Sequence, residues 1–198
     1  APYVDEFIEN RMGGFFGVKK SKNPNAKRVM IAAHMDEIGF MITNITKNGM
    51  IQFTNLGGVA NDIWQGQRLV IKNRNGDKII GVVSNIPKHF RTGSEGAPEI
   101  KDLTLDIGAQ NEDEVRERGI DIGDTIVPHT PFTQLSEHRY SAKAWDNRYG
   151  CVLAIEILEL LKDIELDIDL YVGANVQEEV GLRGAKASAE MIDPDVAF

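Results

Sequence analysis

The chain has 198 residues, a formal net charge of −8 and 42% hydrophobic residues, which allows a folded core in one domain or in two small ones. The negative net charge argues against nucleic acid and anionic membranes as partners, because both require basic surfaces on the protein. A single cysteine, Cys151, excludes an intrachain disulfide framework and is typical of a reducing compartment. No apolar run approaches the roughly 18 residues of a membrane span, so we expect a cytoplasmic protein.

The N-terminal segment predicts a hairpin followed by a buried strand. Strand-like runs at 4–8 and 15–19 flank a glycine-rich turn at 12–14. The continuous apolar run at 29–33 is typical of a central strand that is covered on both faces. This run leads directly into His34.

Between about residues 46 and 137 the pattern changes to short strands at close intervals, which predicts a small barrel or sandwich. The expected strands in this region cover residues 50–54, 67–73, 78–84, 103–107 and 124–128, and a further strand is expected before them at 38–45. A helix interrupts them, because Asn111 followed by Glu114 resembles a capping box and Gly119 suits its end. The long loop at 86–101 is of a kind that often carries function.

The last third alternates helices and strands. The expected elements are a helix at 148–162, a strand at 169–176, a helix at 184–192 and a strand at 196–198. Such alternation predicts a mostly parallel sheet. We therefore expect an α/β fold with a mixed sheet flanked by helices, formed by residues 1–37 and 138–198, with residues 38–137 inserted as a small β-barrel domain.

His34 and Asp36 follow the apolar run, at the strand end where open α/β sheets bind ligands. His34 is either a hydrogen-bonded loop histidine or a metal ligand. A carboxylate at Asp36 can accept the proton of a ligating imidazole and hold its tautomer. The alternative for Asp36 is a simple turn residue.

Three further carboxylates lie at the ends of expected elements. Asp146 precedes the helix at 148–162 and is either its N-cap or a bridge between two divalent cations. Glu178 and Glu179 follow the strand at 169–176. As neighbours in extended backbone they point in different directions, so one can bind a metal while the other reaches its water. The alternative is two solvated loop glutamates.

For several other residues, a structural role is the favoured interpretation. The remaining histidines are interpreted as surface or structural residues: His89, His129 and His138. The large aromatic residues near the motifs are interpreted as packing residues: Trp64, Trp145 and Tyr149. Cys151 is interpreted as a buried structural thiol, because it lies in an apolar helix.

Three strings in a fixed order carry a family resemblance: Ala33-His34-Met35-Asp36-Glu37, Lys143-Ala144-Trp145-Asp146-Asn147-Arg148, and Gln177-Glu178-Glu179-Val180-Gly181-Leu182-Arg183-Gly184. With Asn55-Leu56-Gly57-Gly58, they resemble the tetrahedral (TET) aminopeptidases and the related bacterial glutamyl aminopeptidases. The resemblance covers essentially the whole chain. One short motif is weak, whereas three in order around a β-rich insert are specific.

The resemblance implies a dinuclear site with two divalent metal ions, usually zinc, with cobalt or manganese also accepted. It implies that His34 binds one metal, Glu179 binds the other and Asp146 bridges both. Glu178 matches the general base that takes a proton from the metal-bound water. Asp36 matches the partner of the histidine.

The resemblance also implies a zinc-peptidase-like fold, a cis peptide bond between Asp36 and Glu37, and homo-oligomers from dimers to dodecamers built through the inserted domain. The implied substrates are peptides that lose their N-terminal residue, with Glu or Asp as candidate specificities.

The ligand set is incomplete by comparison with the family pattern. Relatives extend further at both ends, and an aspartate and a histidine ligand should lie after Phe198. Since His34, Asp146 and Glu179 cannot complete two metal sites, we expect a truncated form that is weakly metallated and inactive alone. Two alternatives stay open: a related two-metal deacylase or carboxypeptidase, and a non-catalytic assembly protein.

Overall fold

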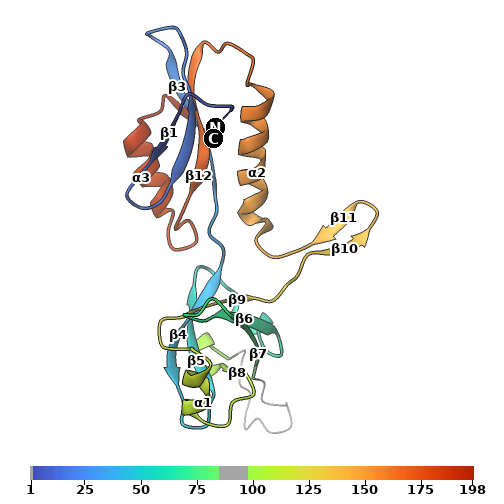
Figure 1. Ribbon diagram of the computed structural model, residues 1–198. Helices are drawn as coiled ribbons and strands as arrows, with labels where there is room; N and C mark the ends of the chain where they lie inside the picture. The colour runs from blue at the N-terminus through green and yellow to red at the C-terminus, as the bar shows by residue number, and fades with distance from the viewer. Residues whose placement is uncertain (1, 85–97) are drawn as a thin grey trace. The chain divides into compact units, whose positions relative to one another are not determined.

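The computed structural model describes residues 2–84 and 98–198. His89 and most of the loop at 86–101 lie outside the described residues. The chain divides into two compact units (Figure 1). The first, called here the α/β unit, joins Ala1–Glu37 to Ala144–Phe198, and the second, the barrel unit, is Ile38–Lys143.

The α/β unit is built on a five-stranded sheet in the order β1-β2-β12-β3-β13. The strands are β1 (Glu6–Glu9), β2 (Phe15–Lys19), β3 (Lys27–His34), β12 (Ile168–Asn175) and β13 (Val196–Ala197). β1, β2 and β12 pair antiparallel, whereas β3 runs parallel to both β12 and β13. The predicted hairpin, the apolar central strand and the mixed sheet are therefore confirmed.

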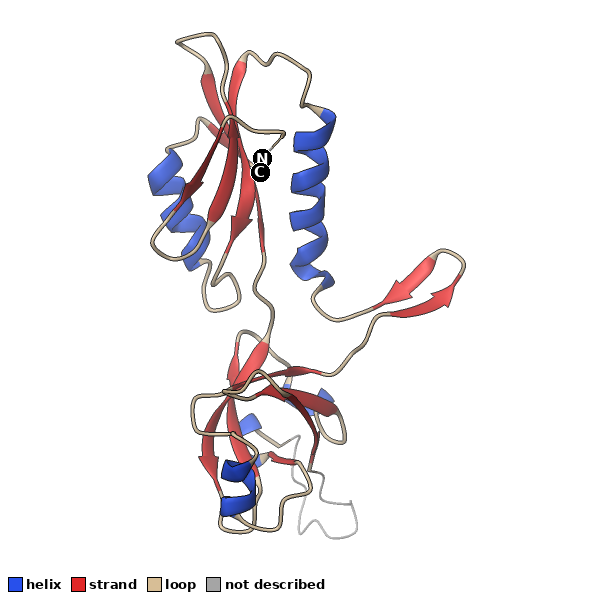
Figure 2. Cartoon of the chain, in the orientation of Figure 1, coloured by secondary structure: helices blue, strands red, loops and turns tan. Residues whose placement is uncertain are grey.

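Two helices cover opposite faces of this sheet, α2 (Trp145–Leu160) and α3 (Arg183–Ile192) (Figure 2). Neighbouring side chains along a strand point to opposite faces. Met30 and Tyr171 therefore pack with Ile192 of α3, whereas Val172, next to Tyr171, packs with Leu158 of α2. The alternation in β3 and β12 thus explains why both faces of the sheet are apolar.

Only one side of α2 is packed within the α/β unit. Ala154 and Leu158 are buried against the sheet, while Ile155 is 59% exposed. Trp145 and Tyr149 are 48% and 54% exposed, so the prediction that they are packing residues is wrong for this unit. The sheet covers a single stripe of the helix, and these aromatic side chains lie outside it.

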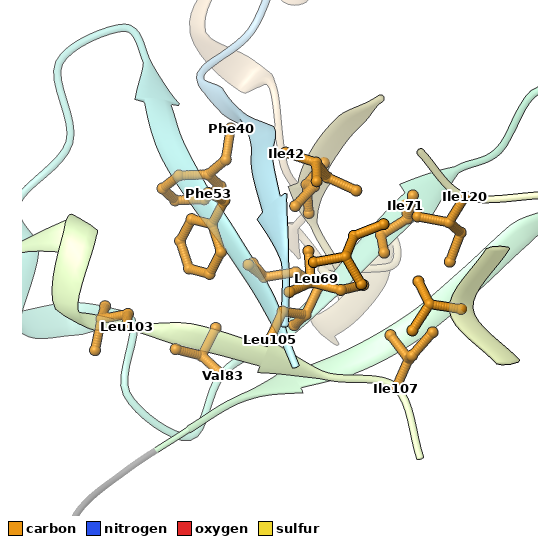
Figure 3. Packing of buried hydrophobic residues seen from close by; sticks show 14 of the residues in the cluster. Phe40, Ile42, Phe53, Leu69, Ile71, Val83, Leu103, Leu105, Ile107 and Ile120 are labelled. Carbon is orange, nitrogen blue, oxygen red and sulfur yellow. The ribbon is translucent and has the colours of Figure 1, made fainter. Parts of the chain in front are cut away.

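The barrel unit contains a closed barrel in the order β4-β5-β8-β7-β6-β9. Its strands are β4 (Gly39–Ile45), β5 (Ile51–Leu56), β6 (Arg68–Lys72), β7 (Lys78–Val83), β8 (Thr104–Asp106) and β9 (Thr125–Pro128). Inward side chains such as Phe40, Phe53, Leu69 and Ile71 fill the interior (Figure 3). Trp64 is buried in the same cluster, as predicted. The inserted small barrel is thus confirmed as an element of the fold.

The helix α1 (Glu112–Glu117) begins as the sequence predicts. The Asn111 side chain accepts a hydrogen bond from the backbone N–H of Glu114 at 2.9 Å. Glu114 Oε2 in turn accepts from the backbone N–H of Gln110 at 3.0 Å. Gly119 follows the helix with φ +74°, a conformation that favours glycine.

Four short elements were not predicted: β10 (Thr133–Ser136), β11 (Arg139–Ser141) and the 3-10 helices η1 (Asn61–Ile63) and η3 (Ile100–Asp102). β10 and β11 form a two-stranded sheet of their own. These segments are too short to show a periodic pattern. Among the described residues, no helix is long and apolar enough to cross a membrane.

Candidate active site

The ends of two neighbouring parallel strands define the position of the site. β3 ends at His34 and β12 ends at Asn175, and these two residues are partners in the sheet register. Parallel strands end at the same edge of a sheet, where ligands bind in open α/β folds. Glu178 and Glu179 follow β12 closely and therefore come next to His34.

The imidazole of His34 is buried, and both of its ring nitrogens face oxygen atoms. Nδ1 lies 3.1 Å from the backbone oxygen of Asp36, and Nε2 lies 3.0 Å from Asp146 Oδ1. A carbonyl oxygen only accepts hydrogen bonds, so Nδ1 carries the proton in this contact. Nε2 then faces the carboxylates, which is the arrangement of a metal-binding histidine whose other nitrogen is held by the protein.

Asp36 connects the two strand ends through its carboxylate. Oδ1 and Oδ2 accept hydrogen bonds from the backbone N–H groups of Glu178 and Glu179, at 3.2 and 3.1 Å. The distance from Asp36 Oδ1 to His34 Nδ1 is 3.5 Å, so the closer partner of the imidazole is the backbone oxygen of Asp36. The carboxylate thus holds the two glutamates in place, a contact that the sequence did not predict.

Asp146 lies in an irregular first turn of α2. The φ and ψ angles of Asp146 (−82°, 107°) and Asn147 (−127°, 36°) are not helical, and the N-cap residue is Ala144. The alternative that Asp146 caps the helix is therefore wrong. Its side chain is 89% exposed, yet Oδ1 faces His34 Nε2, which lies far away in the sequence.

The non-proline cis peptide bond found among the described residues joins Asp146 to Asn147. The prediction of a cis bond between Asp36 and Glu37 is wrong. The backbone oxygen of Asp36 instead faces His34 Nδ1, so this peptide group supports the imidazole.

Glu178 and Glu179 both face the imidazole. One potential ligand atom from each of His34, Glu178 and Glu179 lies within 4.8 Å of the other two, and Glu178 Oε2 is 3.8 Å from His34 Nε2. The backbone turns here rather than staying extended, with Gln177 at φ +58° and Gly181 at φ +113°, so the alternation of an extended strand does not set the directions of these two side chains. Burial and the negative charge of Glu178 raise the pKa of Glu179.

The site contains a cavity of about 260 Å³, whose lining includes His34, Asp146, Asn175 and Glu178. One imidazole and three carboxylates offer nitrogen and oxygen donors, which suit zinc, cobalt and manganese. A separation near 3 Å, as between His34 Nε2 and Asp146 Oδ1, suits two donors that each lie about 2.0–2.2 Å from one ion. The donor set therefore fits a divalent metal ion.

Two residues beside the site were not singled out from the sequence. Asn175 is 5% exposed, and its Oδ1 accepts the hydroxyl hydrogen bond of Ser188 at 2.6 Å. Arg148 donates from Nε to the backbone oxygen of Met35 at 3.2 Å. The signal for Asn175 was a polar residue at the end of an apolar strand, and the signal for Arg148 was its position two residues after Asp146.

The α/β sheet with an inserted barrel is a fold that solved peptidase structures share. The chain belongs to the M42 glutamyl aminopeptidase family, whose model matches residues 13–198.

Curated relatives have different named specificities. The chain is 45% identical to a glutamyl aminopeptidase of Lactococcus lactis subsp. cremoris, over 99% of this chain and 56% of that protein. It is 36% identical to a lysyl aminopeptidase of Pyrococcus furiosus, over 98% of this chain and 56% of that protein. The chain thus spans a little over half the length of these relatives.

Among solved structures, the TET1 peptidase of Pyrococcus horikoshii matches with a TM-score of 0.85 and 31% identity, over 98% of this chain and 57% of that chain. That peptidase is described as assembling into a tetrahedron or a large octahedral shell. The match confirms the fold, including the barrel.

Proposed function

We propose that this protein is a metal-dependent aminopeptidase that removes N-terminal residues from peptides. The observation that carries the proposal is the convergence of His34, Asp146, Glu178 and Glu179 at one edge of the sheet. These residues come from three separate segments and have no other evident reason to gather. Membership in a peptidase family supports the same reaction class.

The proposed role of each residue rests on its position at the site and on the family resemblance. His34, Asp146 and Glu179 would supply three of the ligands of two divalent ions, with Asp146 as the bridge and zinc as the first candidate metal. Bound ions would polarise the scissile carbonyl group and activate a water molecule. Glu178 accepts the proton of the attacking water and returns it to the leaving amine. Asp36 keeps Glu178 and Glu179 in place through their backbone N–H groups.

The preferred N-terminal residue is proposed to be Glu or Asp. The support is that the relative named a glutamyl aminopeptidase is 45% identical, whereas the relative named a lysyl aminopeptidase is 36% identical. Glutamate and lysine side chains carry opposite charges. Membership in the family therefore does not by itself predict the preferred N-terminal residue. Direct comparison of acidic, basic and apolar substrates is therefore part of the test.

Self-association and a cytoplasmic location complete the proposal. The P. horikoshii relative forms large assemblies, and the outer side of β7 exposes Ile80 (49%) and Val82 (46%). Apolar side chains of this kind support contacts between barrel units of a homo-oligomer. The single cysteine supports a reducing compartment.

The test uses anilides of Glu, Asp, Leu and Lys, with and without an N-acetyl group, on the purified full-length protein. We expect release of free N-terminal residues that stops after chelation and returns with zinc, cobalt or manganese. Cleavage of acylated substrates alone would favour the deacylase, and C-terminal release would favour the carboxypeptidase. A stable oligomer without any hydrolysis would identify an assembly protein.

Two glutamate variants sharpen this test. Glu178→Gln removes the proposed base and is expected to lower kcat by about 10²–10⁴-fold. Glu190→Gln, on an exposed position of α3, is the matched control and should keep wild-type kcat. Equal kcat values for the two variants would remove Glu178 from the mechanism.

A further inference from the structure

Arg148 contacts the segment that carries His34 and Asp36. Its Nε donates a hydrogen bond to the backbone oxygen of Met35 at 3.2 Å. Its Nη2 lies 3.8 Å from Glu37 Oε1. Met35 and Glu37 are the two neighbours of Asp36, so the guanidinium group holds this segment on both sides of the aspartate.

The same segment is fixed from β12. The backbone N–H of Met35 donates to the backbone oxygen of Asn175 at 2.9 Å, and the carboxylate of Asp36 accepts from Glu178 and Glu179. Arg148 adds the connection to α2. The residues from His34 to Glu37 are thus held by both of the other segments that bring carboxylates to the site.

The first turn of α2 needs such an external connection. Asp146 and Asn147 are not helical, so regular intrahelical hydrogen bonds do not fix their backbone. The side chain of Asp146 is 89% exposed, so packing does not fix it either. Arg148 follows directly after this irregular pair.

A second side chain of α2 strengthens the same connection. The Cys151 thiol donates to the backbone oxygen of His34 at 3.3 Å. Arg148 and Cys151 therefore bind the carbonyl groups of two consecutive residues, His34 and Met35. Gly150 lies between them, where a Cβ atom would come within 2.8 Å of Ala33 Cβ, so the helix approaches β3 closely at this point.

A role of Arg148 as the cationic receptor of an acidic substrate side chain fits the geometry less well. Its Nε is already bonded to a carbonyl oxygen, and Glu37, with a side chain 14% exposed, balances its charge. An arginine fork that already binds two protein groups has fewer N–H groups left for a ligand. The contacts favour support of the protein over recognition of a substrate.

We infer that Arg148 is a positioning residue that sets the distance between Asp146 and His34 by linking α2 to Met35 and Glu37. The inference rests on the proposed metal-dependent function. Residues that orient metal ligands without touching the ion change metal affinity by about 10–100-fold. A lysine has one compact charge and three rotatable donors in place of a planar fork, so it reproduces this double contact only in part.

The test compares Arg148→Met, Arg148→Lys and Glu37→Gln in the full-length protein with Arg11→Met, which removes an exposed arginine from the hairpin turn. Zinc affinity is measured by competition with a chelator, and the visible absorption spectrum of the cobalt-loaded protein reports ligand geometry. We expect Arg148→Met to weaken zinc binding by about 10–100-fold and to change the cobalt spectrum. Arg148→Lys should lie between wild type and Arg148→Met, Glu37→Gln should shift both readouts in the same direction, and Arg11→Met should match wild type.

The outcomes separate this inference from the proposed function. Wild-type zinc affinity together with a wild-type cobalt spectrum in Arg148→Met would overturn the positioning role, while leaving the aminopeptidase proposal intact. Failure of the wild-type protein to bind any of the metals would overturn both. Weaker binding with an unchanged melting temperature of the metal-free variant supports positioning over a general loss of folding.

Discussion

His34 Nε2 lies 3.0 Å from Asp146 Oδ1, although 112 positions separate the two residues in the chain. If both atoms bind one ion, loss of the Asp146 charge removes a ligand. We expect Asp146→Asn to weaken zinc binding by more than the roughly 100-fold that marks the loss of a supporting residue. Chelator competition measures this effect. Asp163→Asn, at an exposed position after α2, is the control, and equal affinities of the two variants would exclude Asp146 as a ligand.

Glu179 gives a prediction for the pH dependence of the metal-free protein. Burial and the charge of Glu178 raise the pKa of Glu179, so the folded state favours the protonated carboxyl group. That contribution to stability is present at low pH and is lost as the pH rises through the raised pKa. Because glutamine resembles the protonated form, metal-free Glu179→Gln should melt at a higher temperature than wild type near neutral pH.

The difference in melting temperature between Glu179→Gln and wild type should shrink as the pH falls through the raised pKa of Glu179, because the wild-type carboxyl group then takes up its proton. Zinc should reverse the order at neutral pH, because the variant lacks one carboxylate ligand. Thermal unfolding at several pH values, with chelator or with zinc, tests both statements. A difference that stays constant over this pH range would contradict the assignment.

Gly184 lies close to the backbone of Val176, which precedes the turn that carries Glu178 and Glu179. A Cβ atom at this position would collide with the backbone oxygen of Val176, just before Gln177 and the two glutamates. We expect Gly184→Ala to lower the free energy of unfolding by about 1–3 kcal/mol, the usual cost of overpacking. Urea denaturation followed by circular dichroism measures it. Gly58→Ala, where the added Cβ has no neighbour within 4 Å, should be neutral by comparison.

Cys151 should react slowly in the native protein. Burial raises the pKa of its thiol, and the thiolate is the reactive form. At mildly alkaline pH, iodoacetamide should therefore label the folded chain more slowly than the urea-unfolded chain. The rate of the folded chain should also rise at a higher pH. Equal rates in both states would show that the thiol is accessible and unperturbed.

The cap of α1 tests the barrel unit separately. Asn111→Ala removes the acceptor of the Glu114 N–H bond, which should cost about 1 kcal/mol. Faster hydrogen exchange of the α1 amides would reveal the loss, with Asn61→Ala, on an exposed residue, as the control. Unchanged exchange in Asn111→Ala would show that the cap does not limit the stability of α1.

Local patterns were sufficient for most elements of the fold. The apolar run before His34 predicted β3, and the spacing of short strands predicted the barrel. The Asn111 and Glu114 pair predicted the start of α1. Each of these signals depends on residues close together in the chain, because propensity, alternation and capping act over a few positions.

Predictions from neighbouring residues were wrong where contacts between distant segments determine the structure. An aspartate before a helix is a common N-cap, yet Asp146 faces His34 and Ala144 occupies the N-cap position. The cis bond was assigned to the Asp36–Glu37 peptide but lies after Asp146. The apolar sequence of α2 did not show which of its sides the sheet would cover.

The sequence by itself determined the residue types of the candidate site and the strand ends at which they lie. Only the tertiary structure decided that β12 lies between β2 and β3, and this order brings Asp36 to the backbone of Glu178 and Glu179. It also decided that Arg148 links α2 to Met35. The physical reason is that these contacts join segments far apart in the chain. The order of strands and the packing of α2 on the sheet determine such contacts, and no pattern of neighbouring residues encodes them.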